Sequence, residues 1–265
     1  MKNELSEILV KSSVDGTMQP SLFWCPETGK PVPLVVGLHP WSHTRFYPIA
    51  LDRYFPLAQE YGFALLLPDF RGPNLPTNPN AVAGLACGST TARADIFDAI
   101  EDVASRFPVD RANIFLLGTS GGGHMSLLCA ETRPELFRAV DVWCPVTDIA
   151  RWYDHVSACK YKYKGDIEAC LGGTPAEKPE ETDFRSPSAN PAPLAGTTVS
   201  IHHGRRDPIV PYVHSLDLAR KLAEIMPDRF FFEIFDGVHE SFNRHSFEWF
   251  ARLAGTEDAA DRIGQ

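Results

Sequence analysis

Residues 114–124 read IFLLGTSGGGH, and this stretch decides the fold of the chain. An apolar run typical of a buried strand leads into a G-x-S-x-G turn, and a helix-like segment follows. A serine on such a sharp turn has a strained backbone, so only small residues fit two positions before and after it, where Gly118 and Gly122 stand. The turn places the Ser120 hydroxyl at a helix N-terminus, where a developing negative charge is stabilised. The pattern therefore predicts a strand, a tight turn with a nucleophilic serine, and a helix.

Strands and helices alternate along the rest of the chain. Short continuous apolar runs, typical of strands buried on both faces, occur at 33–38, 63–67, 113–117, 139–143, 198–202 and 230–235. The segments between and after them predict helices at 51–61, at 89–107, after Ser120, at 212–225 and at 241–253. An antiparallel hairpin is predicted ahead of them, because residues 8–14 and 17–24 flank Asp15-Gly16. This order predicts an α/β fold with a mostly parallel central sheet and helices on both of its faces.

The length and composition fit one α/β domain over residues 1–265, with 44% hydrophobic residues to fill its core. Residues 148–197 interrupt the alternation, since this segment is too long for a single crossover helix and is rich in proline and aromatic residues. A long segment of this kind is often a lid or a binding element. We expect Trp152 and Tyr153 within it to line a substrate pocket. Residues 255–265 are polar and predict a loose tail.

The formal net charge of −9 argues against nucleic acid as a partner, because phosphate binding needs a basic surface. The first residues lack the apolar core of a secretory signal, and no run of about 18 apolar residues could span a membrane. We therefore expect a cytoplasmic protein without membrane association, or a secreted or periplasmic one if a signal sequence has been removed. Cys159 and Cys170 share one polar segment and could pair in an oxidising compartment.

Side chains that could activate the serine follow two later strands. Asp207 lies after the strand predicted at 198–202, and His239 lies after the strand predicted at 230–235. Functional groups of a parallel sheet gather beyond the carboxyl ends of its strands, and a serine hydroxyl needs a general base to attack a carbonyl. We predict that His239 accepts the proton of Ser120 and that Asp207 orients His239, in the chain order Ser, Asp, His.

Other residues compete for these roles. Asp148 follows the strand predicted at 139–143, which is another position for the acid in enzymes of this kind, and Asp207 precedes a proline and could be a turn residue. His245 competes with His239, although it lies deeper in the last predicted helix. The His, Asp and Cys residues show no metal-ligand spacing, so no metal site is expected.

A site of this kind also needs donors for the oxyanion of the tetrahedral intermediate. One donor should be the N–H of Gly121, which follows the serine. The other should come from the loop after the strand predicted at 33–38, which reads His39-Pro40-Trp41. Because proline has no N–H, we predict Trp41 as the second donor. Each such donor is worth about 3 kcal/mol of transition-state stabilisation.

The whole chain resembles an α/β-hydrolase. It is similar to the catalytic domain of the prolyl oligopeptidase family and to the acetyl xylan and feruloyl esterases built on that domain. The matching pieces are His39-Pro40, PDFRG at 68–72, DIFDAI at 95–100, GTSGG at 118–122, LGGTP at 171–175, RSP at 185–187, His203-Gly204 with Asp207 and Val210-Pro211, and Gly237-Val238-His239. The resemblance implies serine-hydrolase chemistry with neither a metal nor an organic cofactor.

Two features depart from the family pattern. Pro40 stands where family members usually have glycine after the histidine of the oxyanion loop. Family peptidases also carry a β-propeller before the catalytic domain, and these 265 residues leave no room for one, which favours esters over oligopeptides. The sequence therefore predicts a serine esterase, with acetyl or feruloyl esters of carbohydrates as candidate substrates. A small peptidase or amidase with the same site is one alternative, and a non-catalytic binding protein with this fold is another.

Overall fold

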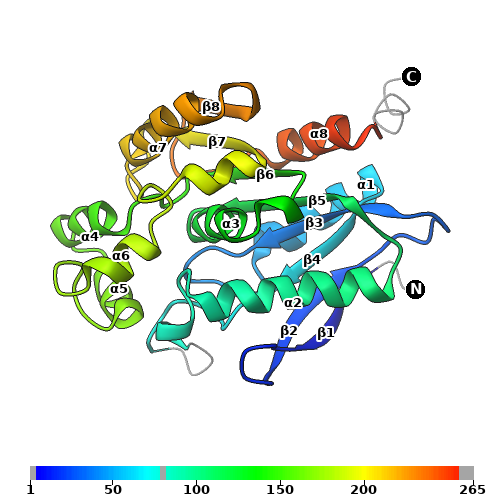
Figure 1. The fold of residues 1–265 in the computed structure, drawn as a ribbon, viewed down its shortest axis with the longest axis horizontal. Helices are drawn as coiled ribbons and strands as arrows, with labels where there is room; N and C mark the ends of the chain where they lie inside the picture. The colour runs from blue at the N-terminus through cyan, green and yellow to red at the C-terminus, as the bar shows by residue number, and fades with distance from the viewer. Residues whose placement is uncertain (1–3, 78–81, 257–265) are drawn as a thin grey trace.

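The described residues form an eight-stranded sheet at the centre of the molecule (Figure 1). The computed structural model describes residues 4–77 and 82–256, so most of the tail predicted at 255–265 lies outside the described residues. The strand order is β1-β2-β4-β3-β5-β6-β7-β8. β1 pairs antiparallel with β2 and β2 pairs antiparallel with β4, whereas the other neighbouring strands are parallel. The predicted mostly parallel sheet with an N-terminal antiparallel hairpin is confirmed.

The strands and the helices that pack on the sheet lie close to their predicted ranges. The strands are β1 (Ser6–Lys11), β2 (Met18–Trp24), β3 (Val32–Leu38), β4 (Ala64–Pro68), β5 (Val109–Thr119), β6 (Ala139–Trp143), β7 (Thr198–Gly204) and β8 (Phe230–Phe235). The helices on the sheet are α1 (Phe55–Tyr61), α2 (Thr90–Arg106), α3 (Gly121–Thr132), α7 (Tyr212–Ile225) and α8 (Asn243–Ala254). A π-helical turn, η1 (Ala50–Tyr54), precedes α1 and makes up the first part of the helix predicted at 51–61.

Helices cover both faces of the sheet, as the buried runs of its strands require (Figure 1). α2, α3 and α7 pack on one face, and α1 and α8 pack on the other. Alternate residues of β5 serve the two cores, since Ile114 and Leu116 join the first and Phe115 and Leu117 join the second. The turn between β5 and α3 therefore lies at the end of the sheet, next to two packed cores.

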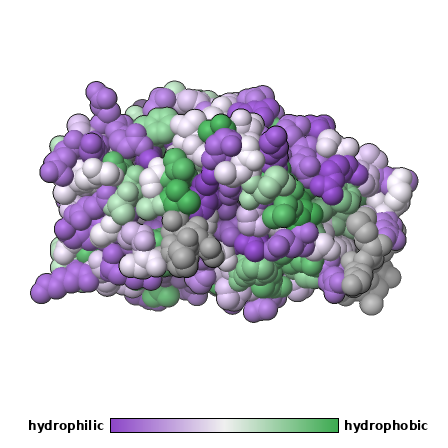
Figure 2. Space-filling view, turned by 90° about the horizontal axis from the view of Figure 1, so that it is seen from below, coloured by the Kyte–Doolittle hydropathy of each residue, from purple (hydrophilic) through white to green (hydrophobic). Residues whose placement is uncertain are grey.

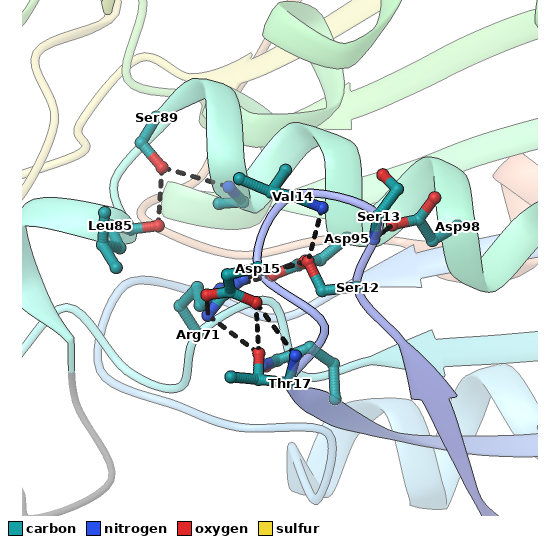
Figure 3. A network of polar contacts seen from close by, with 12 residues as sticks. Ser12, Ser13, Val14, Asp15, Thr17, Arg71, Leu85, Ser89, Asp95 and Asp98 are labelled. Carbon is teal, nitrogen blue, oxygen red and sulfur yellow. Dashed lines mark hydrogen bonds and ion pairs between the residues drawn. The ribbon is translucent and has the colours of Figure 1, made fainter.

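The N-terminal hairpin is tied to the rest of the fold by a buried arginine (Figure 3). Arg71 is 5% exposed, and its guanidinium donates to Asp95 on α2, to Asp15 in the hairpin turn and to the Ser12 hydroxyl. The hydrogen bond from Ser12 N to Thr17 O closes the hairpin, so the first strand ends earlier than the predicted residue 14. The PDFRG and DIFDAI pieces therefore meet in a structural contact away from the turn after β5.

The segment predicted as a long loop at 148–197 is largely helical. It contains α4 (Ile149–Ala158), α5 (Tyr163–Leu171), α6 (Pro179–Phe184) and the short helix η4 (Ala192–Gly196). α4, α5 and α6 lie together beyond one end of the sheet (Figure 1). Their apolar residues form a third core around Trp152 and Ile167, which also includes Trp41 from the loop after β3. The aromatic residues that suggested a binding loop thus bury one another and give the segment its own packing.

Over the described residues, no helix is both long and apolar enough to cross a membrane. Figure 2 shows polar and apolar residues interspersed over the face seen from below. All six cysteines are free thiols, and Cys159 is exposed whereas Cys170 is buried.

Candidate active site

Ser120 occupies the sharp turn between β5 and α3. Its backbone has φ 59° and ψ −121°, a conformation that residues other than glycine rarely adopt. A Cβ on Gly118 would lie 2.4 Å from the carbonyl of Gly122, and a Cβ on Gly122 would lie 2.0 Å from Leu38 O. Both glycines are therefore required by close backbone approaches, as the turn pattern predicts. Ser120 is 9% exposed, and its N–H donates to Trp143 O at 2.9 Å, which ties the turn to β6.

Asp207 and His239 form a hydrogen-bonded pair at the ends of β7 and β8. The Nδ1–H of His239 donates to Asp207 Oδ2 at 2.6 Å. The other carboxylate oxygen, Oδ1, accepts the backbone N–H groups of Ile209 at 2.8 Å and Val210 at 3.0 Å. The Asp207 side chain is fully buried, whereas the His239 side chain is 21% exposed. The imidazole is thus fixed through Nδ1, and the rest of the ring is partly accessible.

The electrostatics of this pair favour an ionised carboxylate. Burial alone would raise the pKa of Asp207. Hydrogen bonds from His203 and His239 outweigh burial and hold that pKa well below its usual range. A buried carboxylate that stays charged can orient the His239 ring and stabilise its imidazolium form.

The backbone of Trp41 lies close to Gly121, the residue after the serine. Gly121 is the first residue of α3, so its N–H has no acceptor within the helix. A Cβ on Gly121 would lie 2.6 Å from Trp41 N, which places the Trp41 amide against the start of α3. His39 supports the intervening backbone, because its Nδ1 lies 3.0 Å from Pro40 O and its ring stacks on Phe70 at 4.1 Å. Pro40 is therefore accommodated in a loop that still presents an amide to the serine turn.

A cavity of about 550 Å³ joins these groups. Ser120, His239 and Trp41 all line it, and Tyr163 of α5 contributes to its wall. The other lining residues come from the loop after β3, from η1, from the end of β5 and from the loop before α8: Pro40, Ser42, His43, Tyr47, Ile49, Arg53, Thr119, Glu240, Ser241 and Phe242. A larger cavity of about 690 Å³ lies among α2, α3 and the α6 region, and none of these candidate groups lines it.

The cavity wall combines aromatic side chains with polar ones. Burial raises the pKa of Tyr47 to about 12, so its phenol is neutral at pH 7. Burial, together with the nearby His39 and Lys162, lowers the pKa of His43 and favours its neutral form. Arg53 and Glu240 are the charged side chains of the lining.

The two aromatic residues expected in the pocket lie elsewhere, so this expectation is corrected. Trp152 is 1% exposed, donates from Nε1 to Ile209 O and packs edge-on against Trp41. Tyr153 lines a separate cavity between α4 and α6 and donates to Glu168. The reason is helical packing: once the segment folds as helices, Trp152 is buried within the third core and Tyr153 packs at the edge of that core, beside Glu168. The segment reaches the cavity through Tyr163.

The competing residues are engaged in other contacts. Asp148 is the N-cap of α4, and its carboxylate accepts the backbone N–H of Arg151 at 3.0 Å. His245, in α8, packs edge-on against Trp143 and His202. Neither residue lines the cavity that contains Ser120. The geometry therefore brings Asp207, rather than Asp148, into contact with His239.

One trio of possible metal ligands occurs within residues 4–77 and 82–256. Donor atoms of Cys144, His203 and Asp207 lie within 4.8 Å of one another. Burial raises the pKa of the Cys144 thiol to about 12, which disfavours the thiolate that a metal needs. His203 Nε2 already contacts Asp207 Oδ2 at 3.2 Å and Val210 O at 2.8 Å. The trio therefore fits a hydrogen-bonded cluster better than a zinc centre.

The fold, an eight-stranded and mostly parallel sheet with helices on both faces, is that of the α/β-hydrolases. The prolyl oligopeptidase family model matches residues 50–255. The chain belongs to the prolyl oligopeptidase family, which is a family of serine hydrolases.

Relatives of the chain include peptidases and an esterase. It is 26% identical over 164 residues to the uncharacterized peptidase YtmA of Bacillus subtilis, covering 62% of this chain and 60% of that one. It is 24% identical over 151 residues to a probable acetylxylan esterase A of Neosartorya fischeri, covering 56% of this chain and 39% of that one. Among solved structures it resembles an acylaminoacyl peptidase of Pyrococcus horikoshii, with a TM-score of 0.72, 18% identity, and coverage of 96% and 41%. The chain thus spans less than two thirds of these proteins.

Proposed function

We propose that the protein is a serine esterase that cleaves carboxylic esters through an acyl-enzyme. The observation that carries this proposal is that one cavity is lined by Ser120, by Trp41 and by His239, which is hydrogen-bonded to Asp207. Nucleophile, base, orienting acid and oxyanion donors are the four parts that acyl transfer requires.

In the first half of the reaction, the Ser120 Oγ attacks the ester carbonyl while His239 Nε2 takes the hydroxyl proton. The N–H groups of Gly121 and Trp41 stabilise the oxyanion. The tetrahedral intermediate then collapses, the carbonyl–alkoxy bond breaks, and His239 gives its proton to the leaving alcohol. In the second half, water attacks the acyl-enzyme with His239 again as base, and the carboxylic acid leaves from Ser120.

For the substrate, we propose acetyl or aromatic acyl esters of carbohydrates. The aromatic part of the cavity wall, which includes Tyr47, Tyr163 and Phe242, supports an uncharged acyl or sugar group. The similarity to a probable acetylxylan esterase supports the same class.

A small peptidase or amidase is the second candidate. The similarity to the uncharacterized peptidase YtmA favours it. The site chemistry is shared, because amides differ mainly in their need for stronger protonation of the leaving nitrogen. The two candidate functions are therefore distinguished by the substrates that are cleaved and not by the residues of the triad.

The test compares acyl p-nitrophenyl esters and acetylated or feruloylated sugars with aminoacyl amides that carry a matched leaving group. The proposal predicts a higher kcat/KM for esters, and Ser120→Ala should lower it by at least about 10⁴-fold. Ser105→Ala is the matched control, because Ser105 is exposed on α2, far from the cavity. Faster cleavage of amides would favour the peptidase, and wild-type turnover by Ser120→Ala would refute the mechanism. Wild-type protein that neither turns over nor reacts with a fluorophosphonate would favour a non-catalytic binding protein.

A further inference from the structure

A second histidine touches the carboxylate that holds His239. His203 stands near the end of β7 and is completely buried. Its Nε2 lies 3.2 Å from Asp207 Oδ2 and 2.8 Å from Val210 O. Its Nδ1 lies 2.8 Å from the Ser215 hydroxyl, at the start of α7. Both ring nitrogens therefore have partners in the interior of the protein.

These partners determine which nitrogen carries a proton. A carbonyl oxygen and an ionised carboxylate oxygen can only accept, so Nε2 must be the N–H donor to Val210 and Asp207. The Ser215 hydroxyl can donate to Nδ1, so Nδ1 can act as the acceptor in this tautomer. His203 is thus fixed as an N–H donor that points at Asp207.

Asp207 Oδ2 consequently accepts from two imidazoles, His239 at 2.6 Å and His203 at 3.2 Å. Its other oxygen is held by the amides of Ile209 and Val210. After the opposing effect of burial, the hydrogen bond from His203 is the largest influence on the pKa of Asp207, and it lowers that pKa. The carboxylate cannot rotate without breaking contacts on both oxygens.

We propose that His203 is a positioning residue of the active site, which fixes the Asp207 carboxylate and shares its Oδ2 with His239. This inference rests on the proposed serine-hydrolase function. A second donor on Oδ2 draws negative charge away from His239, so it weakens the support for the imidazolium form. It also keeps Oδ2 in line with His239 Nδ1, which the proton transfer requires.

Other titratable groups face the Asp207–His239 pair. The Cys144 thiol, after the end of β6, donates to Val238 O and Glu240 O close to Asp207. Glu240 follows His239, and His43, Arg53 and Tyr163 lie in the wall of the same cavity. All of them stay unchanged in the variants below, so they do not account for the expected differences.

His203→Asn and His203→Gln form a matched pair. The amide of asparagine occupies about the position of Nδ1, so it keeps the contact with Ser215 but does not reach Asp207. The amide N of glutamine occupies about the position of Nε2, so it restores a donor to Asp207. Both substitutes are neutral, and they differ by one methylene group.

The readout is the pH dependence of kcat/KM and kcat on a p-nitrophenyl ester. For His203→Asn we expect the acid limb to move up by about 0.5–1 pH unit, because an unshared carboxylate favours protonated His239. We also expect kcat on the plateau to fall about 10-fold with KM changed less than about 2-fold. For His203→Gln we expect both the acid limb and the plateau kcat to lie close to their wild-type values. A purely structural role would lower Tm in both variants and leave the acid limb in place, and this result would overturn the proposal.

A measurement on the wild-type protein avoids any folding defect of the variants. Long-range proton–nitrogen NMR of the histidine rings should find the His203 proton on Nε2 throughout the active pH range. A proton on Nδ1 alone would overturn the proposal. If the wild type hydrolyses no ester or amide, the proposed function fails, and the tautomer still decides whether His203 donates to Asp207.

Discussion

Two of the Asp–His pairs in the described residues differ in where they lie: Asp141 and His202 are within the sheet, whereas Asp207 and His239 lie beyond the ends of β7 and β8, where His239 lines a cavity. Asp141 on β6 and His202 on β7 are joined by a contact of 3.0 Å, which resembles the 2.6 Å contact between Asp207 and His239. In the first pair both side chains are at most 6% exposed, whereas the His239 side chain is 21% exposed. The Trp143 ring also stacks on His202 at 4.1 Å.

The difference lies in the free ring nitrogen. In His202, Nε2 contacts Asp141 and Ser200, and Nδ1 contacts Glu233 on β8. In His239, Nδ1 contacts Asp207, and Nε2 has no hydrogen bond within residues 4–77 and 82–256. A histidine can move protons only through a nitrogen that reaches a reacting group. An Asp–His pair is therefore available for chemistry when one ring nitrogen is left without a partner beside a cavity, and it serves stability when both nitrogens are occupied.

The largest expected effect separates the two histidines by activity. His239→Ala should lower kcat/KM by about 10⁴-fold, because the serine loses its base. His202→Asn should keep kcat within about 10-fold of wild type in the folded fraction, since His202 does not reach the cavity. Steady-state kinetics and thermal unfolding of both variants check this. Comparable losses of kcat in the two variants would contradict the division of roles.

The next effect separates the two aspartates by stability. Asp141 is completely buried and accepts from Trp143 Nε1 at 3.1 Å as well as from His202. Asp141→Asn should destabilise the fold by about 3–5 kcal/mol, because it breaks a buried ion pair and leaves its partner uncompensated. Asp207→Asn should instead mainly lower kcat. Urea unfolding monitored by circular dichroism measures the first loss, and a smaller loss for Asp141→Asn than for Asp207→Asn would reverse the interpretation.

A smaller effect concerns the amides beside the serine. Gly121→Ala places a Cβ 2.6 Å from Trp41 N and should push the two N–H groups apart. Loss of one oxyanion donor costs about 3 kcal/mol, so kcat should fall about 10²-fold. Gly165→Ala in α5 is the control, because its Cβ meets nothing within 4 Å. Equal kinetics for the two variants would exclude this pair of amides as the oxyanion site.

The smallest effect is the pH dependence of the buried pair. Burial opposes the charge of His202, but Asp141 and Glu233 outweigh it and raise the pKa of His202. Burial likewise opposes the charge of Asp141, and His202 outweighs it and lowers the pKa of Asp141. The stabilisation is therefore complete between about pH 4 and 6.5, the unfolded values, and declines as pH rises through the raised value of His202.

Each unit of that upward shift corresponds to about 1.4 kcal/mol. The difference in unfolding free energy between wild type and His202→Asn should accordingly be larger at pH 6 than at pH 9. Urea unfolding at the two pH values measures it. A difference that grows towards pH 9 would contradict a charged His202.

The sequence predicts the sheet and the serine turn because their signals are local. The run at 114–124 specifies strand, turn and helix by its own glycines, and the order Ser120, Asp207, His239 follows from strand ends. The sequence could not decide between Asp207 and Asp148 as the partner of His239, because both follow a strand. The structure shows that Asp148 is the N-cap of α4.

The residues of the cavity wall could not be predicted, because their positions depend on how distant segments pack. Tyr163 and Trp152 are both aromatic residues of one segment, and only the packing of α4 and α5 places the first in the cavity and the second in the core. His203 gave a weak signal, a histidine beside the glycine at the end of β7. Its contact with Asp207 depends on the turn after β7 folding back over the strand end.

The most direct measurement of the central claim is the site of covalent labelling by a fluorophosphonate, mapped by mass spectrometry of the intact protein and its peptides. The account predicts one label per chain, on Ser120, with labelling strongly slowed in His239→Ala and kept in His202→Asn. A label on another residue, or equal labelling of Ser120 in the two variants, would contradict it.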